Sequence, residues 1–173
     1  MLLSFLGNPA FRVPVIPEFS SEAALLAYLG LSAKELKKIL WFRGRMYHQF
    51  ELPKGKGEIR VIEAPDKRLK YLQHQIANRL NLLYRVRNPV HGFVNGKSVK
   101  TNALAHLRKR FVVNIDLRDF FSSITESRII GVLESLSIDS RVAAIIATMC
   151  CHKNRLPQGA PTSPVLSNME PFA

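Results

Sequence analysis

The segment FVVNIDLRDFFSSI, residues 111–124, decides most of what can be inferred about this chain of 173 residues. Its first half is an apolar run rich in β-branched residues, which is typical of a buried strand. Asp116 closes the run, so the sequence predicts a core strand that delivers one carboxylate to a turn. Phe121 follows five residues later. A lone Asp here is also a good helix N-cap, in this case for LRDFFSS, and the segment by itself leaves both interpretations open.

A second informative stretch, LPQGAPTSPVLSN, occupies residues 156–168. Taken by itself, it predicts a Pro-rich turn before a helix that begins near Ser163. Gln158 and Gly159 lie in this turn. Because glycine has no Cβ, Gly159 would permit a close approach to the backbone.

The chain is strongly basic, and the charge is unevenly spread. Its 25 Lys and Arg residues exceed its 13 Asp and Glu residues, which gives a formal net charge of +12. The stretch 34–110 holds 19 basic and 5 acidic residues. A broad basic region attracts a polyanion, most commonly nucleic acid. Ordinary solvated surface and a membrane-facing patch are the alternatives, and the aromatic residues and Gly-containing hairpin of the same stretch favour nucleic acid.

The rest of the composition indicates a globular core in a reducing compartment. The chain is 47% hydrophobic and 22% charged, unlike a disordered protein. Cys150 and Cys151 are adjacent, with no other cysteine to form a disulfide framework or a zinc site, so we expect two buried apolar side chains. Residues 1–14 lack a basic leader and a run as long as a membrane span, which predicts a cytoplasmic protein without a membrane segment.

Local patterns predict a helix-rich chain. Three prolines predict an irregular lead-in over residues 1–19. Apolar periodicity and capping residues predict two short helices, with caps at Ser20–Ser21 and Ser32, and one long helix behind Asp66. Alternation around PKGKG predicts a β-hairpin. The expected helices are 23–29, 33–42, 67–84, 99–109, 126–136 and 140–151, and the hairpin is 46–65.

Four successive blocks resemble, in order, those of the reverse transcriptases of bacterial retrons and group II introns. They are KGKGEIRVIEAPDKRLKYLQHQI in the fingers, HGFVNGKSVKTNA as a second block, FVVNIDLRDFFSSI as palm motif A and LPQGAPTSPVLSN as motif B. Each block is weakly specific, but four in order over residues 46–168 make a specific resemblance. NALAH, residues 102–106, also fits the Asn-Ala-x-x-His pattern characteristic of retron enzymes.

The resemblance implies an RNA-directed DNA polymerase that adds dNMPs to a primer on an RNA template with two Mg²⁺ ions. It makes Asp116 a catalytic residue and a shared metal ligand, with the backbone carbonyl of Leu117 as a further ligand. Phe121 matches the aromatic residue beneath the sugar, whose ring would clash with a ribose 2′-hydroxyl. Its alternative is ordinary core packing, which is expected of Phe120.

The resemblance also implies a set of binding residues. Lys54 and Arg60 match the fingers residues that hold the incoming triphosphate, with Lys56 as a rival for the lysine role. Gln158 and Gly159 match the part of motif B that lies against nucleotide and template. Three further candidates for contact with template or RNA, with surface or packing roles as alternatives, are Arg45, His91 and Asn95.

The sequence departs from the family pattern after Asn168. The Tyr/Phe-x-Asp-Asp hairpin that supplies two more carboxylates does not follow, nor does the thumb. One carboxylate cannot hold two ions, so we expect a truncated or split product that is inactive by itself unless a second chain supplies the missing palm and thumb. The alternative is a non-catalytic RNA-binding fragment of a degenerate or split reverse transcriptase. A basic structural protein unrelated to polymerases would require four chance matches.

We therefore expect an α+β fold, with the fingers and an incomplete palm of a right-hand polymerase. Residues 1–45 would form a helical segment, 46–110 the fingers and 111–173 the partial palm, with FVVNID as a strand whose exposed edge favours aggregation. Expected partners are an RNA template and primer, a structured non-coding RNA and dNTPs. The retron resemblance further implies priming from a 2′-hydroxyl and a role in defence against phage.

Overall fold

Helix α3 (Lys67–Leu83) is the longest of the described helices and packs against α6 (Ser140–Cys150) and α7 (Ser163–Met169). The computed structural model describes residues 16–170, apart from the side chain of Lys56. Asp66 caps α3 by accepting a hydrogen bond from the Leu69 amide at 2.8 Å, as predicted. The apolar residues of its inner face are all buried, namely Leu69, Leu72, Ile76, Leu80 and Leu83.

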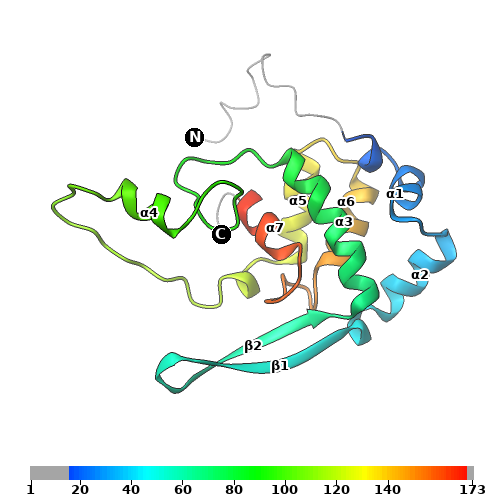
Figure 1. Ribbon diagram of the computed structural model, residues 1–173. Coiled ribbons are helices and arrows are strands. Elements are labelled where there is room, and N and C mark those ends of the chain that lie inside the picture. Colours follow the sequence, from blue (N-terminus) through cyan, green and yellow to red (C-terminus); the bar gives the residue numbers. More distant parts are fainter. Residues whose placement is uncertain (1–15, 171–173) are drawn as a thin grey trace, which may run out of the picture.

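Within residues 16–170 there are six further α-helices, of which α4 lies apart from the others (Figure 1). They are α1 (Glu22–Leu29), α2 (Ala33–Phe42), α4 (Val99–Ala105), α5 (Glu126–Ser135), α6 (Ser140–Cys150) and α7 (Ser163–Met169). Single 3₁₀ turns span Pro17–Phe19, Arg43–Met46, Gly55–Gly57 and Phe121–Ser123. Ser21 and Ser32 are N-caps as predicted, and Ser32 with Glu35 completes a capping box. The rest of the predicted lead-in, residues 1–15, lies outside the described residues.

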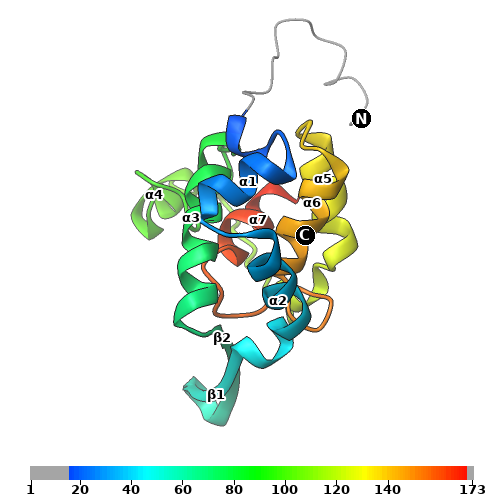
Figure 2. The same ribbon diagram turned by 90° about the vertical axis from the view of Figure 1, so that its right-hand side faces the viewer.

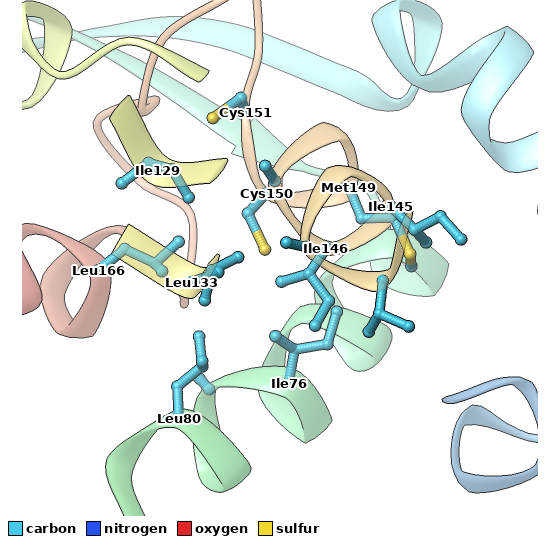
Figure 3. Packing of buried hydrophobic residues seen from close by; sticks show 14 of the residues in the cluster. Ile76, Leu80, Ile129, Leu133, Ile145, Ile146, Met149, Cys150, Cys151 and Leu166 are labelled. Carbon is cyan, nitrogen blue, oxygen red and sulfur yellow. The ribbon is translucent and has the colours of Figure 1, made fainter. Parts of the chain in front are cut away.

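The core lies between α3, α5, α6 and α7. Figure 3 shows Ile76 and Leu80 of α3 facing Ile146 of α6 and Leu133 of α5. Cys150 and Cys151 belong to the same cluster and are free and fully buried, which confirms their predicted role. Burial raises the pKa of the Cys150 thiol to about 12, because an apolar interior disfavours a thiolate.

One antiparallel hairpin extends from the helical body, as predicted (Figure 1). Strand β1 (Tyr47–Lys54) pairs with β2 (Glu58–Pro65), from Tyr47↔Pro65 at the base to Lys54↔Glu58 at the tip. The tip is exposed on both faces, whereas Glu63 and Pro65 at the base are buried. A helix-rich chain with this two-stranded sheet confirms the expected α+β class.

The predicted core strand over residues 111–116 is wrong. This segment has no regular structure, and Phe111, Val113 and Ile115 are 79%, 80% and 83% exposed. A strand in the interior needs a hydrogen-bonding neighbour on at least one side. Within residues 16–170 the sheet contains only β1 and β2. No strand in this part of the chain pairs with the segment, and its backbone is left to hydrogen-bond with water.

Two smaller predictions around this segment are also corrected. The 3₁₀ turn Phe121–Ser123 has Phe120 as its N-cap residue and no side-chain cap, so Asp116 does not cap LRDFFSS. Helix α4 ends at Ala105, short of the predicted Lys109. Arg108 takes a positive φ of 58°, which a continuing right-handed helix does not accommodate.

None of the described helices combines the length and apolar character that crossing a membrane requires.

We predict that Ile146→Ala lowers the free energy of unfolding by about 2–5 kcal/mol, because it leaves a cavity at the fully buried centre of the core. Urea denaturation followed by circular dichroism measures the change. Ile59→Ala is the matched control, since Ile59 is 61% exposed on the hairpin, and it should change stability by less than about 0.5 kcal/mol.

Candidate active site

The motif B turn lies along the free edge of β2. The Glu63 amide donates a hydrogen bond to the Gln158 carbonyl oxygen at 2.8 Å. Gly159 follows with a φ of +130°, and a Cβ there would stand 2.7 Å from Ile62 Cγ2 and 3.1 Å from the Glu63 carbonyl oxygen. Position 159 therefore requires glycine for two reasons: its backbone conformation and its lack of a side chain. The close approach predicted at Gly159 is made, in this structure, to the hairpin.

The Glu63 carboxylate fixes the same junction from within. Its side chain is buried, and Oε1 lies 2.8 Å from Lys153 Nζ, 3.9 Å from Arg155 Nη2 and 3.8 Å from His152 Nε2. Lys153 and Asn154 both take positive φ, so the chain reverses tightly and presents these side chains together. Removing a carboxylate from water is costly, and the two nearby cations, Lys153 and Arg155, offset that cost.

An aromatic stack joins the foot of the hairpin to the helical body. The rings of Tyr47 and His152 stack with their centroids 4.3 Å apart. Gln73 of α3 donates to the Tyr47 hydroxyl at 2.8 Å and to the Met149 carbonyl at 2.7 Å. Burial lowers the pKa of His152, against the opposing pull of Glu63, so the neutral imidazole is favoured near pH 7. The base of the hairpin is thus held on both faces.

The predicted triphosphate-binding residues share one face of the hairpin. Arg60 pairs with Leu52, and Lys54 is two residues further along β1, so the Lys54 and Arg60 side chains leave the same face. Both are exposed, and Lys54 also pairs with Glu58 at 3.2 Å. Ile62, against which Gly159 packs, lies on that face too. The cationic face therefore continues into the motif B turn. The side chain of Lys56, the alternative lysine, lies outside the described residues.

The predicted metal ligands lie in the irregular segment that follows α4. Asp116 is exposed, and Leu117 is 55% exposed. The adjacent Arg118 pairs with Asp119 at 3.8 Å. Within residues 16–170, no three His, Cys, Asp or Glu side chains come together as a metal-binding group. The Asp116 carboxylate and the Leu117 carbonyl are oxygen donors of the kind that Mg²⁺ prefers, and they form only part of a binding set.

Phe121 lies where the irregular segment rejoins the body. It is partly buried against the core, with its ring centroid 5.3 Å from that of Phe120 and 6.3 Å from that of Phe93. Two roles were considered for Phe121, a clash with a ribose 2′-hydroxyl and ordinary core packing, and both are compatible with this position. The contact with Phe93 brings the second block next to palm motif A.

The second block is hydrogen-bonded to α7, the helix that forms the second half of motif B. The Asn168 side chain donates to the Gly92 carbonyl at 3.0 Å, and His91 Nδ1 lies 2.9 Å from Thr101 Oγ1. Asn95 lines a hollow of about 420 Å³, together with Asn81, Tyr84, Val86, Phe93 and Val94. The buried Tyr84 hydroxyl has no hydrogen-bond partner within the described part of the chain. Arg45, the remaining candidate, lies at the far side of the hairpin base with its guanidinium 5.8 Å from the centre of the Phe42 ring.

The sequence predicted the hairpin and motif B. It did not predict that Glu63, Lys153 and Arg155 meet where the hairpin joins the loop before motif B. A signal for them was present. Glu63 occupies the same face of β2 as Ile59 and Val61, where an acid needs a partner if that face is buried. The sequence HKNR supplies three basic side chains within four residues, just before motif B.

Comparisons with known proteins show the family to which the sequence is similar. Residues 52–170 match the family described as reverse transcriptase (RNA-dependent DNA polymerase). The retron Mx65 reverse transcriptase of Myxococcus xanthus is 35% identical over 88% of this chain and 41% of its own length. The retron Ec86 reverse transcriptase of Escherichia coli is 35% identical over 80% of this chain and 44% of its own. The retron Mx162 reverse transcriptase of Myxococcus xanthus is 32% identical over 91% of this chain and 37% of its own length. The chain thus spans less than half the length of these relatives.

We predict that Gly159→Ala separates the motif B turn from the hairpin, because the new methyl group would overlap Ile62 and the residue would keep a disfavoured φ. The expected loss of unfolding free energy is about 2 kcal/mol. Faster hydrogen exchange at the Glu63 amide would show that the stability is lost at the contact between the hairpin and the motif B turn. Gly44→Ala is the control, since a Cβ at Gly44 meets no atom within 4 Å. Unchanged exchange at Glu63 in Gly159→Ala would show that the turn does not depend on this contact.

The lowered pKa of His152 predicts a pH-dependent stability. Since burial favours the neutral ring, the folded state gains stability above the unfolded pKa of about 6.5 and loses it as the pH falls toward the lower folded pKa. His152→Gln removes this titration. Urea denaturation at pH 7.5 and pH 5.5 should therefore show a smaller loss on acidification in the variant than in the natural chain. An equal loss in both would place the pH dependence in other groups.

Proposed function

The chain belongs to the reverse transcriptase family and is of the retron type, and from this membership we propose that it supplies the fingers and part of the palm of an RNA-directed DNA polymerase. Residues 46–110 are assigned to the fingers and 111–173 to the palm, after a helical segment over 1–45. The observation that carries the proposal is the packing of Gln158–Gly159 against β2, which joins motif B to the cationic face of the hairpin.

Triphosphate binding is assigned to the hairpin face that carries Lys54 and Arg60. Both side chains are exposed and leave the same face, which suits them to receive phosphate oxygens. The planar guanidinium of Arg60 can donate two parallel hydrogen bonds, while Lys54 offers a mobile point charge. Gln158 and Gly159, at the foot of that face, are assigned to the base and sugar side of the incoming dNTP.

Metal binding is assigned to Asp116 and to the Leu117 carbonyl. The family uses divalent ions, and the exposed oxygen donors at these positions suit Mg²⁺. When bound, the ions supply charge neutralisation and a more acidic primer 3′-hydroxyl. Since the described residues offer only part of a binding set, we propose that this polypeptide by itself does not extend a primer and that a further segment or a second chain completes the site.

The nucleic-acid path is assigned to the second block and its surroundings. The hollow beside Asn95 has a polar and an aromatic lining, which suits a template base. Phe121, in contact with Phe93 of that lining, is assigned the exclusion of the ribose 2′-hydroxyl. His91 and Arg45 are weaker candidates, since His91 is engaged with Thr101 and Arg45 with Phe42.

The irregular segment 111–116 is expected to become a strand in the complete palm. Its apolar side chains are exposed, and its alternation of β-branched residues suits a strand once a neighbour supplies hydrogen bonds. The proposed partners are dNTPs, an RNA template with primer and a structured non-coding RNA, in the cytoplasm. A role in phage defence belongs to the same proposal and rests on the retron relatives.

The test is primer extension with Mg²⁺ and dNTPs by a chimera that joins residues 1–170 to the remaining part of the Escherichia coli retron Ec86 enzyme. We predict incorporation by the chimera and none by this chain by itself. Asp116→Asn in the chimera should reduce incorporation on the order of a thousandfold, because a metal ligand is lost. Asp119→Asn is the matched control. Asp119 is an exposed acid three residues away, and asparagine tolerates its positive φ, so this variant should retain activity.

Full activity of the Asp116→Asn chimera would contradict the assigned metal ligand. Clear incorporation by the isolated chain that vanishes in Asp116→Ala would contradict its proposed inactivity. Specific RNA binding by a chimera that incorporates nothing would favour the alternative of a non-catalytic RNA-binding fragment.

A further inference from the structure

Trp41 is the single tryptophan of the chain, and it is 83% exposed on α2. Single exposed apolar residues are common on protein surfaces, but an indole is a large one to leave in water. Phe42 beside it is 46% exposed. Both residues precede residues 52–170, the part of the chain that matches the reverse transcriptase family.

Helix geometry turns Trp41 away from the core. Leu36 and Ile39 are buried and define the inner face of α2. At 100° per residue, Trp41 points about 140° from Leu36 and about 200° from Ile39, which is the outer face. In Figure 2, α2 lies at the front, on the outside of the molecule. The exposure of Trp41 therefore follows from the helix itself and not from a local distortion.

Three lysines share that outer face. Lys37 and Lys38 precede Trp41 by four and three residues, and Lys34 precedes it by seven, so all three lie on the same side of the helix and are exposed. The acid of the same helix, Glu35, is held by Ser32 and by Arg68, whose Nη2 lies 2.9 Å from Glu35 Oε1. Arg45 extends the basic stripe beyond the helix end, over the Phe42 ring.

We propose that this stripe, Lys34, Lys37, Lys38, Trp41 and Arg45, binds single-stranded nucleic acid, with one base stacked on the Trp41 indole and the adjoining phosphates on the lysines. Sites of this kind combine an exposed aromatic ring with a track of cations. An unpaired base offers a free face for stacking, whereas the bases of a duplex are already stacked on one another. The proposal does not require polymerase chemistry, so it stands or falls separately from the proposed function.

The position of Trp41 provides a direct assay. Because it is the sole tryptophan, the emission of the full chain reports on this one ring. Titration with a short unstructured RNA strand should quench the emission, and the quenching should weaken as salt is raised, since phosphate contacts release counterions. A duplex of the same sequence should quench less. A DNA strand of the same sequence determines whether the sugar contributes.

Variants separate stacking from charge. Trp41→Ala should weaken binding of the labelled RNA strand, measured by anisotropy, on the order of tenfold, and Trp41→Phe should recover most of the loss. Lys37→Glu with Lys38→Glu should weaken binding more than Lys67→Glu with Lys70→Glu, which changes the net charge equally from exposed positions on α3. Circular dichroism checks that each variant folds.

Three results would overturn the proposal. One is RNA binding that leaves Trp41 emission unchanged, which would place the nucleic acid elsewhere. Another is equal weakening by the α2 and α3 charge reversals, which would indicate a diffuse electrostatic attraction. The last is quenching by an acidic peptide but not by a single strand, which would make the stripe a protein-docking surface.

Discussion

Glu63 carries a carboxylate into the interior at the foot of the hairpin, where Lys153, Arg155 and His152 surround it. Its own amide binds the Gln158 carbonyl, so side chain and backbone join the hairpin to the same loop. A buried charge that loses a partner is strongly destabilising, which makes this junction hard to deform. The position of motif B relative to the cationic hairpin face depends on it.

The helical part of the fold could be predicted because its information is local. Leu69 to Leu83 repeat at helical spacing, Asp66 and Ser32 are recognisable caps, and the apolar run before Cys150 had to be buried. The hairpin was equally readable, since alternation and the PKGKG turn act over a few residues. These predictions required no knowledge of distant parts of the chain.

The segment 111–116 shows where such reasoning fails. Its residues favour a strand, but a strand is completed by hydrogen bonds to a neighbour, and the described residues supply none.

The candidate site was only partly predictable from the sequence. Lys54, Arg60 and Gly159 follow motif patterns, whereas the approach of Lys153 to Glu63 spans ninety residues and depends on tertiary packing. Local sequence indicates that Glu63 needs a partner and that HKNR is basic, but it does not show that the two segments meet.

Two surfaces of different character emerge from the structure. One is the hairpin face with motif B, on residues that match the reverse transcriptase family, and we propose that it binds dNTPs. The other is the outer face of α2, which precedes the matched region and carries Trp41 among lysines. The helical body holds both, because α2 packs on α6 while α3 contacts β2 and α7. A rigid core with two cationic surfaces suits a protein that handles nucleic acid.

The buried Glu63 carboxylate is inferred to couple the hairpin to the loop before motif B. A double-mutant cycle with Glu63→Gln and Lys153→Met measures that coupling from four free energies of unfolding. We predict a coupling of about 1 kcal/mol or more, as for contacting residues in one ion-pair network. A coupling within about 0.3 kcal/mol of zero would contradict it and would leave the Glu63 amide and the Gly159 contact to hold motif B on the hairpin.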